Sequence, residues 1–175
     1  AEGNLAVNNS SIGGDFSLRQ SAWKEAKFND VKIKGHTNCH SIRLEKGGFW
    51  DKTVAKSLEF QFARLHKLTV RSCQVEKFSL TNAHVAESVE IIQSSAGIAH
   101  FVQLTAMSLD IQRCQLGSEV DLRKAKVNSS IWIKECEVAG PAEMGKLVVQ
   151  ICETGDHLEI PDITVQPLVQ EIVPL

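Results

Sequence analysis

The chain has 175 residues, of which 43% are apolar, and this suits one domain with a continuous core. A net charge of -2 and a pI of about 6.3 exclude a strongly basic surface for nucleic acid or anionic membranes, and the charge is small for an acidic mimic of DNA. Aromatic residues make up only 6%, with no Tyr, so large stacking platforms for bases or sugars are not expected.

No apolar stretch approaches the roughly 20 residues of a membrane-spanning helix, so no span is expected. The first residue is Ala1, which fits both an exported mature chain and a cytoplasmic piece of a longer protein, and localisation stays open. The odd set of five cysteines has no CxxC pair, which argues against a disulfide framework and a redox motif.

Residues 1–15 are rich in Asn, Ser and Gly, and we expect a leading loop or a first irregular coil there. Apolar or small residues then recur weakly in pairs with a period of five: Phe16/Leu18, Ser21/Trp23, Ala26/Phe28 and Val31/Ile33. The period is lost over residues 36–57, where Gly47-Gly48 and Phe49-Trp50 predict a corner insertion or a short helix starting near Lys52.

The segment from Leu58 to Val85 has the clearest repeat. Its pairs follow one another every five residues, with a polar residue inside each: Leu58/Phe60, Ala63/Leu65, Leu68/Val70, Cys73/Val75, Phe78/Leu80 and Ala83/Val85. This period fits neither an α-helix nor a long strand. It fits a chain that takes a short extended step and turns a corner, so that four steps close one coil of about 20 residues.

Residues 97–107 are apolar but out of phase, which predicts a bulged or looped coil. The repeat returns from Leu109 to Val138, with two six-residue steps. A longer period places Cys73, Ser95, Cys114 and Cys136 in one inward column of small side chains, with Ile92-x-x-Ser95-x-Gly97 as a degraded copy.

After Gly140-Pro141 the pattern ends, and Pro161, Pro167 and Pro174 make a long helix unfavourable. We therefore divide the chain into a β-helix domain, residues 1–140, and a C-terminal segment, residues 141–175, that caps the last coil or binds a partner. The fold class is all-β, a right-handed parallel β-helix with four-sided coils.

The repeat resembles the pentapeptide-repeat family, whose units read Ala, Asp or Asn, Leu, any residue, Gly. The nearest matches are residues 26–30, residues 31–35 and Ala83-His84-Val85. Here the polar residue between the inward pair is mostly neither Asp nor Asn, and the bulky position is often β-branched or aromatic. The resemblance implies the fold and carries no single activity.

Few residues suggest a site, and no cofactor or metal is expected. His36, Cys39 and His40 have side chains that suit zinc, without a second cluster to complete the ligands. Trp132 lies where the pattern predicts an outward residue, so it marks a binding face or lies under the tail. Possible interaction residues are Trp132, Leu168, Val169 and Ile172.

The sequence favours a non-enzymatic structural or protein-interaction module, with a protein partner or self-association. One alternative is a carbohydrate-binding or carbohydrate-cleaving β-helix, which needs charged residues clustered on one outer face; the candidates are Asp110, Arg113, Asp121, Arg123, Lys124 and Lys134. The other alternative is a pentapeptide-repeat mimic of DNA, which the modest net charge does not favour; binding to nucleic acid itself is not expected either.

Overall fold

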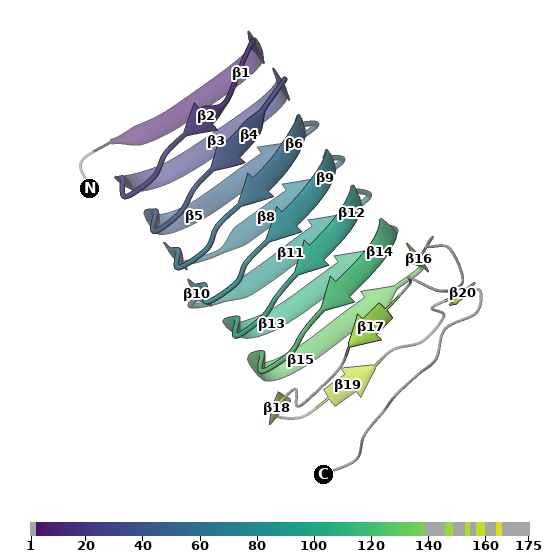
Figure 1. Ribbon diagram of the computed structural model, residues 1–175. Coiled ribbons are helices and arrows are strands. Elements are labelled where there is room, and N and C mark those ends of the chain that lie inside the picture. Colours follow the sequence, from purple (N-terminus) through teal and green to yellow (C-terminus); the bar gives the residue numbers. More distant parts are fainter. Residues whose placement is uncertain (1–2, 139–145, 149–152, 155–156, 160–163, 166–175) are drawn as a thin grey trace.

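The computed structural model describes residues 3–138, 146–148, 153–154, 157–159 and 164–165. All secondary-structure elements in these ranges are β-strands, and the paired strands run parallel (Figure 1). One layer holds β2 (Phe16–Ser17), β4 (His36–Asn38), β6 (Val54–Glu59), β9 (Gln74–Ser79), β12 (Ser95–His100), β14 (Gln115–Asp121) and β17 (Lys146–Val148).

The layer behind it holds β1 (Asn4–Ile12), β3 (Ala22–Ile33), β5 (Arg43–Asp51), β8 (Leu68–Arg71), β11 (Ser88–Ile92), β13 (Thr105–Gln112), β15 (Lys126–Lys134) and β19 (His157–Glu159). Two-residue strands link the layers: β7 (Arg64–Leu65), β10 (His84–Val85), β16 (Glu137–Val138), β18 (Glu153–Thr154) and β20 (Thr164–Val165). The chain therefore winds into a parallel β-solenoid, as the repeat predicts.

Six coils follow one another. The first five, from Phe16 to Val120, take 20 or 21 residues each, and the sixth takes 27, because Val120 pairs with Leu147. The strand register shows the length of a coil directly, because Val89 pairs with Leu68 of the preceding coil and with Leu109 of the following coil. The predicted coil length of about 20 residues is thus confirmed. The coils begin at Phe16, Thr37, Leu58, Phe78, Ala99 and Val120.

The inward pairs predicted between Leu58 and Val85 form the core. All of them are buried except Val75, which is half-buried. The residue inside each pair points outward, but Ser79 is only 1% exposed. It lies in register between Glu59 and His100, whose larger side chains cover it.

Of the two alternatives predicted for residues 36–57, the corner insertion is confirmed and the short helix is wrong, and the coil keeps its inward pairs. The pairs Thr37/Cys39, Ile42/Leu44, Gly48/Trp50 and Thr53/Ala55 continue the buried pattern, with one extra corner residue before Gly48. Strand β6 occupies the place of the expected helix. Thr and Gly at inward positions hid the pattern, although parallel coils accept them because neighbouring side chains fill the space.

Residues 97–107 also keep the register, so the predicted looped coil is wrong. Ala99/Phe101 and Leu104/Ala106 are buried in phase with Leu109. The expected copy at Ile92, Ser95 and Gly97 is off by one, because Ile91, Ser94 and Ala96 point inward instead. The pairing with β14 shifts between Ala96 and Ile98, because β14 has one extra residue between Leu116 and Glu119, whereas the pairing with β9 is regular.

Two opposite corners of each coil are made by single residues in the left-handed backbone region. At one of these corners Ser41, Phe62 and Asn82 have φ of 56°, 57° and 56°. Each of their N–H groups donates to a carbonyl of the next coil, at 2.8, 3.1 and 2.9 Å. These ladder bonds hold a conformation that residues other than Gly rarely adopt.

Aromatic side chains form a continuous stack inside the first five coils. Phe28 lies flat on Trp50 with ring centroids 5.0 Å apart, and Phe60 meets Trp50 edge-on at 4.8 Å. The stack includes Phe16, Phe28, Trp50, Phe60, Phe78 and Phe101. Room for the indole comes from Gly48, since a Cβ there would lie 2.2 Å from Cζ3 of Trp50.

The two ends of the solenoid differ. At the C-terminal end β17, β18, β19 and β20 pair in parallel with β14, β15 and β16, so described strands follow the sixth coil. At the N-terminal end residues 4–12, expected as a loop or irregular coil, form strand β1 and pair with β3. The division at residue 140 stays a prediction.

Candidate functional site

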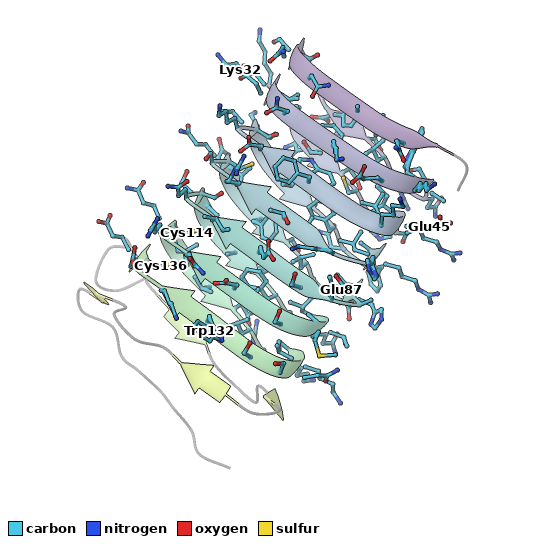
Figure 2. All side chains as sticks on the ribbon, turned by 180° about the vertical axis from the view of Figure 1, so that it is seen from behind. Lys32, Glu45, Glu87, Cys114, Trp132 and Cys136 are labelled. Carbon is cyan, nitrogen blue, oxygen red and sulfur yellow. The ribbon has the colours of Figure 1, made fainter. Side chains whose placement is uncertain are left out.

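Trp132 points outward from β15, next to Asp110 in the strand register (Figure 2). Its ring is partly exposed, and the Lys134 ammonium lies 3.4 Å from the ring centroid as a cation–π contact. One ring face is therefore already occupied by a side chain of the same strand. Leu168, Val169 and Ile172, the other predicted interaction residues, lie outside the described residues.

The six charged residues considered for a carbohydrate-cleaving site do not form one cluster. Asp121 and Arg123 pair with each other on the layer of β14, whereas Asp110 and Lys134 lie on the layer of β13 and β15. Arg113 forms an ion pair with Glu135 at 2.7 Å. The predicted cluster is therefore divided between two sides of the solenoid.

Some outward carboxylates are paired with lysines. Lys67 lies 2.6 Å from Glu90, and Lys27 lies 2.8 Å from Glu25.

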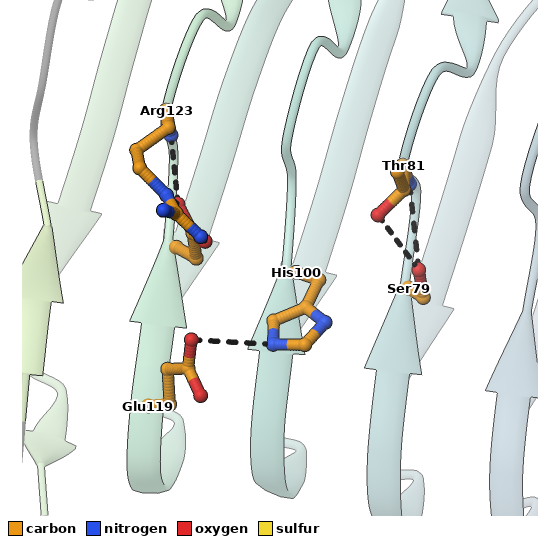
Figure 3. A network of polar contacts seen from close by, with 6 residues as sticks. Ser79, Thr81, His100, Glu119 and Arg123 are labelled. Carbon is orange, nitrogen blue, oxygen red and sulfur yellow. Dashed lines mark hydrogen bonds and ion pairs between the residues drawn. The ribbon is translucent and has the colours of Figure 1, made fainter.

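A polar network lines the outer column of β9, β12 and β14 (Figure 3). Asp121 is 1% exposed and accepts hydrogen bonds from the guanidinium and backbone N–H of Arg123, at 2.9 Å for both Nε–Oδ2 and N–Oδ1. Burial raises the pKa of Asp121, but these hydrogen bonds outweigh it and lower the pKa below its ordinary value. His100 Nε2 lies 3.5 Å from a Glu119 oxygen.

This network explains how one series of corners forms. Side-chain oxygens of Asn38, Ser79 and Asp121 accept the backbone N–H of the residue two positions later. The left-handed residue follows in each case, at Ser41, Asn82 and Lys124. These are local turns of the Asx and Ser/Thr kind, so these hydrogen bonds shape the corners.

The inward column of small residues is confirmed, with Ser94 in place of Ser95. The thiols of Cys73, Cys114 and Cys136 point to backbone carbonyls between 3.2 and 3.5 Å away. Burial raises the pKa of Cys73 to about 11, and a hydrogen bond with Cys136 together with burial raises the pKa of Cys114. The column is thus a packing feature of free thiols.

The zinc-like cluster separates in the structure. Cys39 points into the core and burial raises the pKa of its thiol, whereas His36 lies outside against Ser57 Oγ at 2.9 Å. His40 contacts the neighbouring Ser41 hydroxyl. Among the described residues no three His, Cys, Asp or Glu side chains are placed to hold a metal ion.

A shallow polar depression crosses β9, β12 and β14. It has a volume of about 340 Å³ and is lined by Ser72, Cys73, Gln74, Gln93, Ser94, Ser95, Arg113 and Gln115. A smaller hollow of about 170 Å³ adjoins it at Ser95 and Gln115, with Gly97 and Gly117 in its wall. Amide, hydroxyl and guanidinium groups therefore surround the larger depression, and no carboxylate does.

The N-terminal end presents an apolar edge. Strand β1 pairs with β3 along one side, and no described strand pairs with its other side. Most of the half-buried apolar side chains packed against the core belong to this end: Leu5, Val7, Ile12, Phe16 and Trp23, against Val75 and Ala96 elsewhere. Here the core ends without a described coil above it.

Strand β1 also lacks the usual protection of a sheet edge. Residues 4–12 read Asn-Leu-Ala-Val-Asn-Asn-Ser-Ser-Ile, with no charged residue and no proline. Natural edge strands commonly carry Lys, Pro or a bulge, because an open edge otherwise pairs with other strands. Sequence reasoning missed this edge, since the repeat is weakest there, although the uncharged stretch was visible.

Comparison with family models, with curated proteins and with solved structures found no match for this chain. No described helix has the length and apolar character needed to cross a membrane.

Proposed function

We propose that this chain is a non-enzymatic protein-interaction module, a rigid β-solenoid that joins another protein end-on through strand β1. The uncharged edge of β1, with which no described strand pairs on its outer side, lies over the half-buried Leu5 and Val7 and carries the proposal. A strand added there gains the same ladder of backbone hydrogen bonds and the same apolar burial as each coil inside the solenoid. The five-residue spacing of buried pairs supports a pentapeptide-repeat-like organisation for the module.

Photo-crosslinking tests the proposal in the native host. A benzophenone amino acid replaces Ala6, which is exposed on β1, in the full-length chain. The control replaces Thr69, which lies three coils farther in along the same outward column. We expect a covalent protein adduct from the Ala6 probe and at least tenfold less from the Thr69 probe. Equal adducts from both probes, or none from either, would contradict the proposal.

A second candidate function is the binding of a neutral carbohydrate in the polar depression around Ser95. Gln74, Gln93 and Gln115 supply paired donors and acceptors of the kind that sugar hydroxyls need. A glycan array tests it with the full chain and a Gln74→Ala/Gln115→Ala variant. Binding that this variant loses supports the candidate, and the absence of any bound glycan removes it.

A further inference from the structure

The proposed interaction leaves open which chain pairs with β1, and the edge itself favours one occupant. We propose that a second copy of this chain docks N-terminal end to N-terminal end, with β1 antiparallel to β1 of the second copy. The proposal rests on the function proposed above and names the partner for that edge.

The register follows from the side-chain alternation of β1. Leu5 and Val7 are half-buried and point inward, whereas Asn4, Ala6 and Asn8 are exposed. Two identical ends meet around a twofold axis, which makes the paired strands antiparallel. An axis at Ala6 puts Ala6 opposite its own copy, Leu5 opposite Val7, and Asn4 opposite Asn8. Apolar side chains then meet apolar ones inside, and amides meet amides outside.

Charge supports this pairing. Because residues 4–12 hold no charged group, two copies of β1 meet without like charges opposite each other. Strand β3 in the next coil is different, since Lys24, Glu25, Lys27, Asp30 and Lys32 all lie within it. Self-pairing therefore suits this edge and would not suit β3 in its place.

A head-to-tail arrangement on the sixth coil is less favourable. The outer sides of β14 and β15 already pair with β17, β18 and β19. A second copy stacked there would have to pair with these two- and three-residue strands, which offer a shorter ladder than the nine residues of β1. The N-terminal end has no such described cover.

Disulfide trapping tests the interface directly in the purified full chain. An Ala6→Cys variant and a control Lys27→Cys variant are both made with Cys152→Ser, since the other four cysteines are buried. Opposed residues in an antiparallel pair have Cβ atoms about 5 Å apart, so mild oxidation should link Ala6→Cys. Two Lys27→Cys residues would lie roughly 14 Å apart, three strand spacings, and should stay reduced. We expect at least tenfold more covalent dimer from Ala6→Cys.

Light scattering gives the second measurement. The unmodified chain should have twice the mass of one chain, and Ala6→Lys, which sets two ammonium groups opposite each other, should shift it to one while leaving the circular dichroism unchanged. A monomeric mass for the unmodified chain at all concentrations, or a dimer without the Ala6→Cys crosslink, overturns this interface. If the Ala6 photo-probe then labels a different protein, the end-on function stands and only the second copy is lost. If it labels nothing, both fail.

Discussion

The pair Gly48/Trp50 allows a sharp test of how the core is packed. In the neighbouring coil Ala26/Phe28 occupies the same register position, so the two coils fill equivalent space in the core with different pairs of side chains. Gly48→Ala would place a Cβ 2.2 Å from Cζ3 of Trp50 and 3.0 Å from Cδ1 of Leu44. Such overpacking costs about 1–3 kcal/mol. Trp50→Phe leaves a gap between Phe28 and Phe60 and costs about 1–2 kcal/mol.

The double variant recreates the Ala/Phe pair of the neighbouring coil. The smaller ring frees the space that the new methyl group needs, so the two changes should compensate each other by at least about 1 kcal/mol. Urea unfolding followed by circular dichroism measures the free energy of unfolding for the parent, both single variants and the double variant. Strict additivity of the two losses would refute the claim that the indole is what requires glycine at position 48.

Three further predictions concern the corners, the ion pairs and the thiols. Phe62 is 55% exposed at a left-handed corner, so Phe62→Asn should raise the free energy of unfolding by about 0.5–1 kcal/mol in urea titrations; a loss would contradict the strain argument. The hydrogen bond from Arg71 lowers the pKa of Asp51 although burial opposes it, so this pair stabilises the fold above the ordinary carboxylate pKa and the contribution fades as the pH falls through the lowered value. Asp51→Asn should cost only about 1 kcal/mol of unfolding free energy at pH 7, because Arg71 is half-exposed. The loss should be clearly smaller at pH 3, where protonation weakens the pair, and an equal loss at both pH values would count against it. Mass-mapped labelling with a thiol reagent at pH 8 should leave Cys39 and Cys73 unmodified until urea unfolds the chain, and fast labelling of either in the native protein would contradict its burial.

The core could be predicted wherever both inward residues of a pair are apolar. From Leu58 to Val85 that condition holds throughout, and the predicted pairs are the buried ones. It fails where Thr37, Gly48 and Thr53 point inward, so the sequence showed the corner insertion but could not show that the coil continues through it. The side-chain size that fits an inward position depends on the residues packed around it in the core. The pattern within one coil therefore cannot show that Trp50 fills the space next to Gly48.

The residues that form the corners could not be predicted from the sequence. Phe62 and Lys124 are poor choices for a left-handed backbone, and no residue preference points to them. Phe62 is held by the ladder bond from its N–H to Thr81 of the next coil, and Lys124 follows a turn in which Asp121 accepts the N–H of Arg123. Once known, this acceptor three residues before the corner is a signal that can be sought in sequence.

An end coil of a solenoid differs from an inner coil, because one of its edges has no neighbouring coil to pair with. Each coil is a template for the next, so growth stops only where a cap, a charge or a missing N–H blocks the edge. All four prolines of this chain lie after residue 140, and none lies near β1. Proline cannot donate to a ladder, and among the described residues pairing after residue 140 is confined to the short strands β17, β18, β19 and β20, whereas β1 has nine residues and no proline. We therefore expect a partner that extends the solenoid to pair with the nine-residue edge of β1 rather than with the two- and three-residue strands described at the other end.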